Sequence, residues 1–125
     1  MKPKALLAID YGQKHCGLAY TPNGVNIFPI SVVPPAQIES AVSLAIAEKG
    51  IESLVLGLPL STNGEENKLC AEVRQFGRRL KRQFGLDIDF VDERFSSKSA
   101  VTAKAGERID DRAAAQILEY YLAAL

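Results

Sequence analysis

The chain has 125 residues, of which 47% are hydrophobic and 24% are charged, the balance of an ordinary soluble globular protein. This length predicts one domain over residues 1–125. Fifteen basic residues balance fifteen acidic ones, which excludes a strong overall positive field, so any contact with a polyanion must come from a local patch.

Cysteine usage and the N-terminus narrow the class of protein further. Cys16 and Cys70 stand alone, outside CxxC spacing, which argues against a zinc site or a disulfide framework. The apolar run near the N-terminus is too short for a signal peptide or a membrane span. We therefore expect a cytoplasmic protein with no membrane partner.

Three segments near the N-terminus have the composition of strands, at residues 4–9, 16–20 and 25–33. The sequence "TPNG", residues 21–24, joins the second to the third and is typical of a hairpin turn. Pro29 lacks a backbone N–H and predicts a bulge or an edge position in the third strand.

Helices and strands alternate through the rest of the chain. A helix is expected at roughly 36–49, where Gly50 ends it. A strand is then expected at 51–59, followed by a polar loop and a helix that ends at about 84. A fifth strand is expected at 86–95, a short helix from Ser97, and a last helix from about 110 to 125. This order predicts an α/β fold with a five-stranded mixed sheet flanked by helices, in which the later strands are parallel.

Three carboxylates fall at the ends of these elements, where functional groups of α/β proteins gather. Asp10 ends the first strand, Glu93 lies near the end of the fifth, and Asp110 opens the last helix. Each acid also has a structural alternative: a turn at Asp10, an ion pair of Glu93 with Arg94, and a helix cap at Asp110.

The last helix places Asp110 near the sheet. At about 100° per residue, Asp110 falls close to the centre of the apolar stripe and Asp111 towards its margin. The stripe consists of Ala113, Ala114, Ile117, Leu118, Tyr121, Leu122 and Leu125.

An acid at the end of a buried strand requires a positive partner, because an unpaired buried charge is costly. Three converging carboxylates repel one another unless cations are bound. Oxygen ligands suit Mg²⁺ or Mn²⁺, and the sequence has no histidine or cysteine array for zinc. Two such ions about 4 Å apart can hold an in-line displacement at phosphorus. A two-ion site at Asp10, Glu93 and Asp110 is the resulting expectation.

Four stretches, "AIDYGQKHCGLA", "LVLGLPLSTNGEE", "FVDERFSS" and "IDDRAAAQILEYYL", resemble in order and spacing the motifs of the YqgF/RuvX family. The resemblance spans nearly the whole chain. It implies a ribonuclease H-like (RNase H-like) three-layer sandwich and a hydrolase of ester bonds, a divalent-metal-dependent nuclease that matures the 5′ end of pre-16S rRNA. Some members of the family look like Holliday junction resolvases instead.

The resemblance carries the family's catalytic and metal-binding acids onto Asp10, Glu93 and Asp110. It also matches Lys14 and Arg94 to basic positions, which implies that they position or neutralise the phosphate. Arg94 has the alternative role of orienting Glu93.

Two departures from the family pattern concern how the substrate is held. His15 stands where the family often has a basic residue. Only 16 residues separate Glu93 from Asp110, in a segment that is usually longer and rich in lysine and arginine. The metal site is not affected by either departure.

The second helix offers a compensating basic surface. Its core stripe is Leu69, Val73, Phe76, Leu80 and Phe84, and its cations are Arg74, Arg78, Arg79, Lys81 and Arg82. These cations could line a nucleic-acid backbone, and Arg74, Arg78 and Arg82 are the expected contacts. The alternative is a solvated helix face.

The loop "GLPLSTNG" contains Gly57, Pro59 and Gly64, which could shape a loop near the site. It lacks the Lys-Ser/Thr of a phosphate-binding P-loop, so nucleotide binding there is weakly supported.

Rival functions are an actin-like or sugar-kinase ATPase, which needs two such domains, and a non-catalytic nucleic-acid-binding ribosome-assembly factor. The presence of all three acids favours an enzyme over the binding factor. Between enzymes, a resolvase of branched DNA requires a two-fold homodimer, for which the nearly uncharged face beside Tyr120 offers a surface. We expect a pre-rRNA nuclease, with the Holliday junction resolvase as the alternative.

Overall fold

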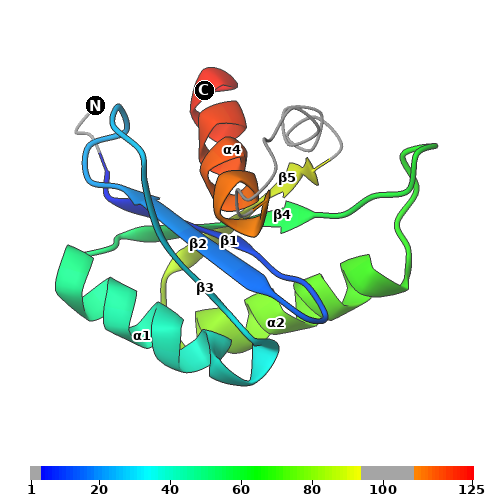
Figure 1. Cartoon of the computed structure of the whole chain (residues 1–125), viewed down its shortest axis with the longest axis horizontal. Coiled ribbons are helices and arrows are strands. Elements are labelled where there is room, and N and C mark those ends of the chain that lie inside the picture. Colours follow the sequence, from blue (N-terminus) through cyan, green and yellow to red (C-terminus); the bar gives the residue numbers. More distant parts are fainter. Residues whose placement is uncertain (1–3, 94–108) are drawn as a thin grey trace.

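The computed structural model describes residues 4–93 and 109–125, with the backbone alone at 109–111. Its centre is a five-stranded sheet in the order β3-β2-β1-β4-β5 (Figure 1). The strands are β1 (Leu6–Asp10), β2 (Cys16–Thr21), β3 (Phe28–Val33), β4 (Ser53–Leu58) and β5 (Asp87–Asp92).

The sheet is mixed, as the order of elements predicts. β1 pairs antiparallel with β2 and parallel with β4, and β4 pairs parallel with β5. The carboxyl ends of β1, β4 and β5 therefore meet at one edge of the sheet.

The third strand lies at the edge of the sheet, where proline is tolerated. β3 begins at Phe28, later than the predicted 25, and pairs only with β2. Its register shifts between Leu18 and Ala19, and Pro29 is the partner of Ala19. Both features predicted from Pro29, the bulge and the edge position, are confirmed.

In the described part of the chain, helices cover both faces of the sheet (Figure 1). α1 (Ile38–Lys49) follows a short 3₁₀ turn and ends at Gly50, and α2 (Lys68–Phe84) ends at Gly85. Both glycines have positive φ, 62° and 69°, the left-handed conformation that commonly ends helices. Of the described helices, α4 (Ile109–Ala123) is the one that packs on the opposite face. The short helix expected from Ser97 lies outside the described residues.

Side chains of the central strands point alternately to the two faces of the sheet, and each face has its own hydrophobic core. Leu7 and Ile9 of β1 pack with the α1 and α2 side chains, whereas Leu6 and Ala8 pack with those of α4. Both faces of β1 are covered by helices, which explains its nearly continuous apolar sequence.

The predicted stripe of α4 is correct in its first part and wrong at its end. Ala114, Ile117 and Leu118 are fully buried. Leu125 is 85% exposed because the helix stops at Ala123. No helix in the described part of the chain is long and apolar enough to cross a membrane.

Candidate active site

Asp10 is the last residue of β1 and lies at the carboxyl-end edge of the sheet. Side chains alternate along a strand, so Asp10 faces the same side as Leu6 and Ala8, the side covered by α4. The strand becomes half-buried only at this last position. The fold thus places a carboxylate at the edge of the core between the sheet and α4.

Glu93 follows the last residue of β5 directly. It reaches the same place as Asp10, although β4 separates the two strands. Neighbouring strands lie about 4.8 Å apart, so β1 and β5 are about 10 Å apart. The side chain of Glu93 must therefore cross over β4.

Gly57 of β4 is the position that Glu93 crosses. Ile9 is the register partner of Leu56, which places Gly57 beside Asp10. A Cβ atom built on Gly57 would lie 2.5 Å from Cγ and 2.7 Å from Cδ of Glu93. The arm of Glu93 occupies the space that a side chain at position 57 would fill.

The two carboxyl groups share a hydrogen bond. Burial, then a hydrogen bond with Asp10 and the negative charge of Asp10, raise the pKa of Glu93 from its ordinary 4.5 to about 10. At neutral pH Glu93 therefore carries a proton, which it donates to the carboxylate of Asp10. A shared proton on oxygen ligands is what a divalent cation would displace, so this pair fits Mg²⁺ or Mn²⁺.

The third predicted ligand, Asp110, is the second residue of α4. It precedes Ile117 by two helical turns, so the two positions share a face of the helix. Ile117 Cδ1 would lie 2.7 Å from a Cβ atom on Gly57, which directs that face to the carboxyl pair. The side chain of Asp110 lies outside the described residues, and among those described no cluster of three acidic, histidine or cysteine ligands forms.

The turn between β1 and β2 carries Lys14 to the same edge. A Cβ atom on Gly12 would lie 2.5 Å from the carbonyl oxygen of His15, so only glycine allows this tight turn. Cys16 closes the turn by donating from Sγ to the carbonyl of Gly12. Lys14 and His15 are both exposed, at the edge where a phosphate would approach Asp10. Arg94 lies outside the described residues.

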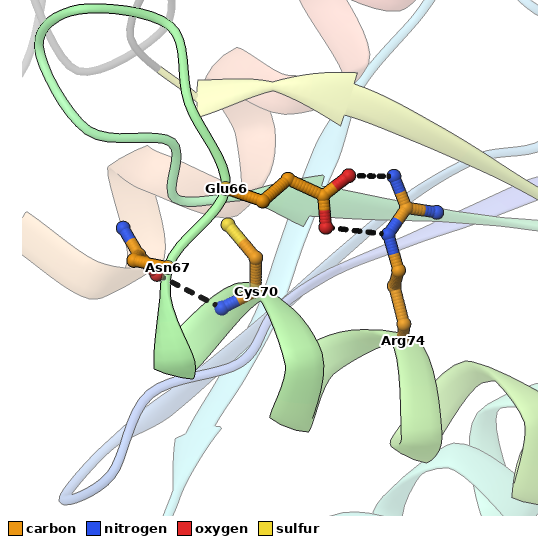
Figure 2. A network of polar contacts seen from close by, with 4 residues as sticks. All are labelled: Glu66, Asn67, Cys70 and Arg74. Atoms are coloured by element: carbon orange, nitrogen blue, oxygen red, sulfur yellow. Dashed lines mark hydrogen bonds and ion pairs between the residues drawn. The ribbon is translucent and has the colours of Figure 1, made fainter.

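A polar network fixes the start of α2 beside the same edge (Figure 2). The side chain of Asn67 accepts a hydrogen bond from the backbone N–H of Cys70, at 3.0 Å, and caps the helix. Its amide donates to the carbonyl of Pro59, at 2.9 Å, and to Ser61. The loop after β4 is thereby tied to α2.

The cations of α2 divide into paired and unpaired groups. Arg74 holds Glu66 through two hydrogen bonds, one of 2.8 Å from Nε (Figure 2), and its guanidinium lies 5.0 Å from the ring centre of Phe90. Arg79 pairs with Glu39 and Lys81 with Asp87. Within the described residues no ion pair engages the exposed Arg78 and Arg82, which line a surface hollow with Gln75, Arg79 and Lys81.

Arg78 and Arg82 lie away from the carboxyl pair. Arg78 is ten residues beyond Lys68, which corresponds to about 15 Å along the helix. The basic hollow is therefore a separate surface, on the helix layer opposite α4.

A family model described as RuvX, Holliday junction resolvase, matches residues 4–124. This chain belongs to the RuvX family. A relative from Picosynechococcus is 32% identical over 98% of this chain and 94% of its own length. A relative from Marinobacter nauticus is 33% identical over 93% of this chain and 90% of its own length. Both relatives bear the name "Putative pre-16S rRNA nuclease".

Solved structures of RuvC share the fold of this RuvX family member. T. thermophilus RuvC in complex with a Holliday junction substrate superposes with a TM-score of 0.64 at 16% identity, covering 96% of this chain and 94% of that one. A second Thermus thermophilus RuvC structure gives a TM-score of 0.58 at 14% identity, with 96% of each chain covered. The predicted RNase H-like three-layer sandwich is confirmed.

Sequence reasoning missed two features of this RuvX site. The sequence places Gly57 in the expected strand at 51–59 and gives it only a loop-shaping role, without its close approach to Glu93. A glycine among bulky strand residues is a signal of such an approach. The sequence also gives no sign that Glu66 neutralises Arg74. Glu66 precedes α2 and lies eight residues before Arg74. Helical spacing therefore does not predict that the two side chains pair.

Proposed function

We propose that this RuvX family member is a divalent-metal-dependent endonuclease that hydrolyses phosphodiester bonds during 5′-end maturation of pre-16S rRNA. The observation that carries the proposal is the hydrogen-bonded pair of Asp10 and Glu93 at the carboxyl ends of β1 and β5. The names of the relatives from Picosynechococcus and Marinobacter nauticus support the choice of substrate.

Asp10, Glu93 and Asp110 would hold Mg²⁺ or Mn²⁺ in a two-ion site. When bound, such ions activate a water molecule and stabilise the charge that develops on the leaving oxygen. Asp10 would contribute an oxygen ligand from the end of β1, and Glu93 would contribute a second one in its deprotonated form. The proposed role of Asp110 is to complete the set from α4.

Basic residues would hold the nucleic acid at two places. Lys14 and Arg94 would neutralise the phosphate next to the acids. Arg78 and Arg82 would contact the backbone farther away, through the hollow on α2. Arg74 is a weaker candidate, because a phosphate must compete with Glu66 for its guanidinium.

The description of the matching family supports a second candidate, a Holliday junction resolvase acting on branched DNA. Symmetric cleavage of two strands requires a two-fold homodimer. The partner would then be a second copy of the chain, and the substrate would be DNA in place of RNA.

A side-by-side cleavage assay separates these candidates. A labelled rRNA precursor end and a four-way DNA junction are offered with Mn²⁺ or Mg²⁺, to the unaltered protein and to Asp10→Asn. The proposal expects RNA cleavage that Asp10→Asn abolishes. Paired symmetric nicks in the junction would establish the resolvase, and no Asp10-dependent cleavage of either substrate would favour a non-catalytic assembly factor.

A further inference from the structure

Gly57 is a glycine whose backbone does not require one. It lies inside β4, the strand between β1 and β5. It is not among the described glycines with positive φ, so other residues could adopt its conformation. Glycine in a strand interior weakens the sheet, and it often marks a close approach of another group.

The close approach at Gly57 comes from two elements at once. A Cβ atom there would lie 2.5 Å from Cγ of Glu93 and 2.7 Å from Cδ1 of Ile117. Carbon atoms in ordinary contact are about 3.5–4.0 Å apart. Any side chain at position 57 would therefore displace Glu93, Ile117 or both.

Displacement of Glu93 would separate the carboxyl pair. Asp10 lies beside Gly57 in the sheet, and Glu93 reaches it only across the α-carbon of Gly57. Ile117 of α4 approaches the same space, so a side chain at position 57 would compete with both residues for it.

We infer that Gly57 is a positioning residue for the proposed nuclease site: the missing side chain at position 57 lets Glu93 meet Asp10 across β4. This inference rests on the proposed function for its consequence, the metal site, but its geometric part does not. Gly57 has no side chain with which to bind substrate or ion, and its proposed action is through Glu93.

The test compares Gly57→Ala with Gly77→Ala. Gly77 is a matched control, because a Cβ atom on it would also be tightly placed, 3.1 Å from Cζ of Phe90, but on the α2 face of the sheet. Mn²⁺ binding is followed by the loss of the free Mn²⁺ signal in electron paramagnetic resonance. Crystal structures of the variants and the unaltered protein give the separation of the Asp10 and Glu93 carboxyls.

Gly57→Ala is expected to widen this separation and to weaken Mn²⁺ binding by about 10–100-fold. Cleavage should lose kcat while KM for the nucleic acid stays unchanged, since the basic surfaces are intact. Gly77→Ala should leave all three measurements as in the unaltered protein. An unchanged carboxyl separation and Mn²⁺ affinity in Gly57→Ala would overturn the inference.

A second background guards against a variant that does not fold. Ile117→Val removes only Cδ1, the atom through which Ile117 approaches a Cβ atom at position 57, and leaves the close approach of Glu93 in place. The double variant Gly57→Ala with Ile117→Val is then compared with the single variant Ile117→Val. A wider carboxyl separation and weaker Mn²⁺ binding in the double variant are expected, and no change in either would overturn the inference. If the unaltered protein neither binds Mn²⁺ nor cleaves, the proposed function fails; a wider carboxyl separation in Gly57→Ala would still support the positioning role, and an unchanged one would overturn it.

Discussion

Asp10 and Glu93 share a hydrogen bond although they come from strands that are not neighbours. Each is half-buried at the edge of the core between the sheet and α4, where water screens charge poorly. In the metal-free protein the pair is held together by a proton on Glu93. The same pair should exchange this proton for a divalent cation, because cation binding requires the deprotonated carboxylate.

The proton on Glu93 predicts a pH dependence of stability. Its pKa is raised in the folded protein from 4.5 to about 10, so between these values the native state holds a proton that the unfolded chain has released. The free energy of unfolding of the chelator-treated protein should therefore fall as pH rises through this range. Urea unfolding at about pH 6 and about pH 9 measures the change.

Glu93→Gln provides the control for this prediction, since glutamine cannot titrate. The decline of stability with pH should be shallower in Glu93→Gln than in the unaltered protein. Equal slopes in the two proteins would contradict the raised pKa.

The positions of Asp10 and Glu93 at strand ends were easier to predict from the sequence than the residues that surround them. Asp10 and Glu93 could be predicted because a strand end is visible in the alternation of apolar residues. Gly57 could not be assigned its role, because its contacts with Glu93 and Ile117 join residues far apart in the chain. The side-chain placement of Asp110 and the roles of Lys14 and Arg94 stay predictions.

The second helix illustrates what periodicity can and cannot predict. Its buried residues Val73, Phe76 and Leu80 follow from helical spacing. The partners of its cations do not, because Glu66, Glu39 and Asp87 come from three other segments. Of the four arginines of α2, Arg78 and Arg82 enter no ion pair with the described residues, which makes them the stronger candidates for nucleic-acid contact.

Reversing both charges, Arg78→Glu with Arg82→Glu, should weaken nucleic-acid binding. The slope of log affinity against log salt should become shallower by about one for each phosphate that the variant no longer neutralises. Titrations of labelled RNA between about 50 and 200 mM salt measure this slope.

A charge-matched control separates the α2 surface from the overall charge. Lys4→Glu with Lys49→Glu makes the same change in net charge on exposed residues outside the hollow. Its salt slope should stay close to that of the unaltered protein. If the α2 variant and this control behave alike, the hollow is not a specific binding surface.

The start of α2 depends on Asn67. Asn67→Ala removes the helix cap and the two bonds from its amide to Pro59 and Ser61, and should lower the free energy of unfolding by at least about 1 kcal/mol. Asn63→Ala, which removes the acceptor of the Glu65 N–H in an exposed loop, should cost less. Urea unfolding compares the two variants, and an equal loss in both would argue against the capping role.

The topology of the sheet can be predicted from the order of helices and strands along the chain. Three strands and then alternating helices and strands predict the mixed sheet, and the crossover rule predicts the parallel pairing of β1, β4 and β5. That pairing brings three strand ends to one edge and so makes the site. The ends of elements were less predictable: the apolar pattern continues to Leu125 after α4 has ended.

We propose that the paired carboxyls of Asp10 and Glu93 form a divalent-cation site in this RuvX family member. The most direct test is calorimetric titration of Mn²⁺ in two buffers of different ionisation enthalpy, which yields both affinity and proton release. The unaltered protein should bind Mn²⁺ with release of protons, and Asp10→Asn should lose this binding while Asp87→Asn, at the opposite end of β5, retains it. Equal Mn²⁺ binding by Asp10→Asn and the unaltered protein would contradict a cation site at this carboxyl pair.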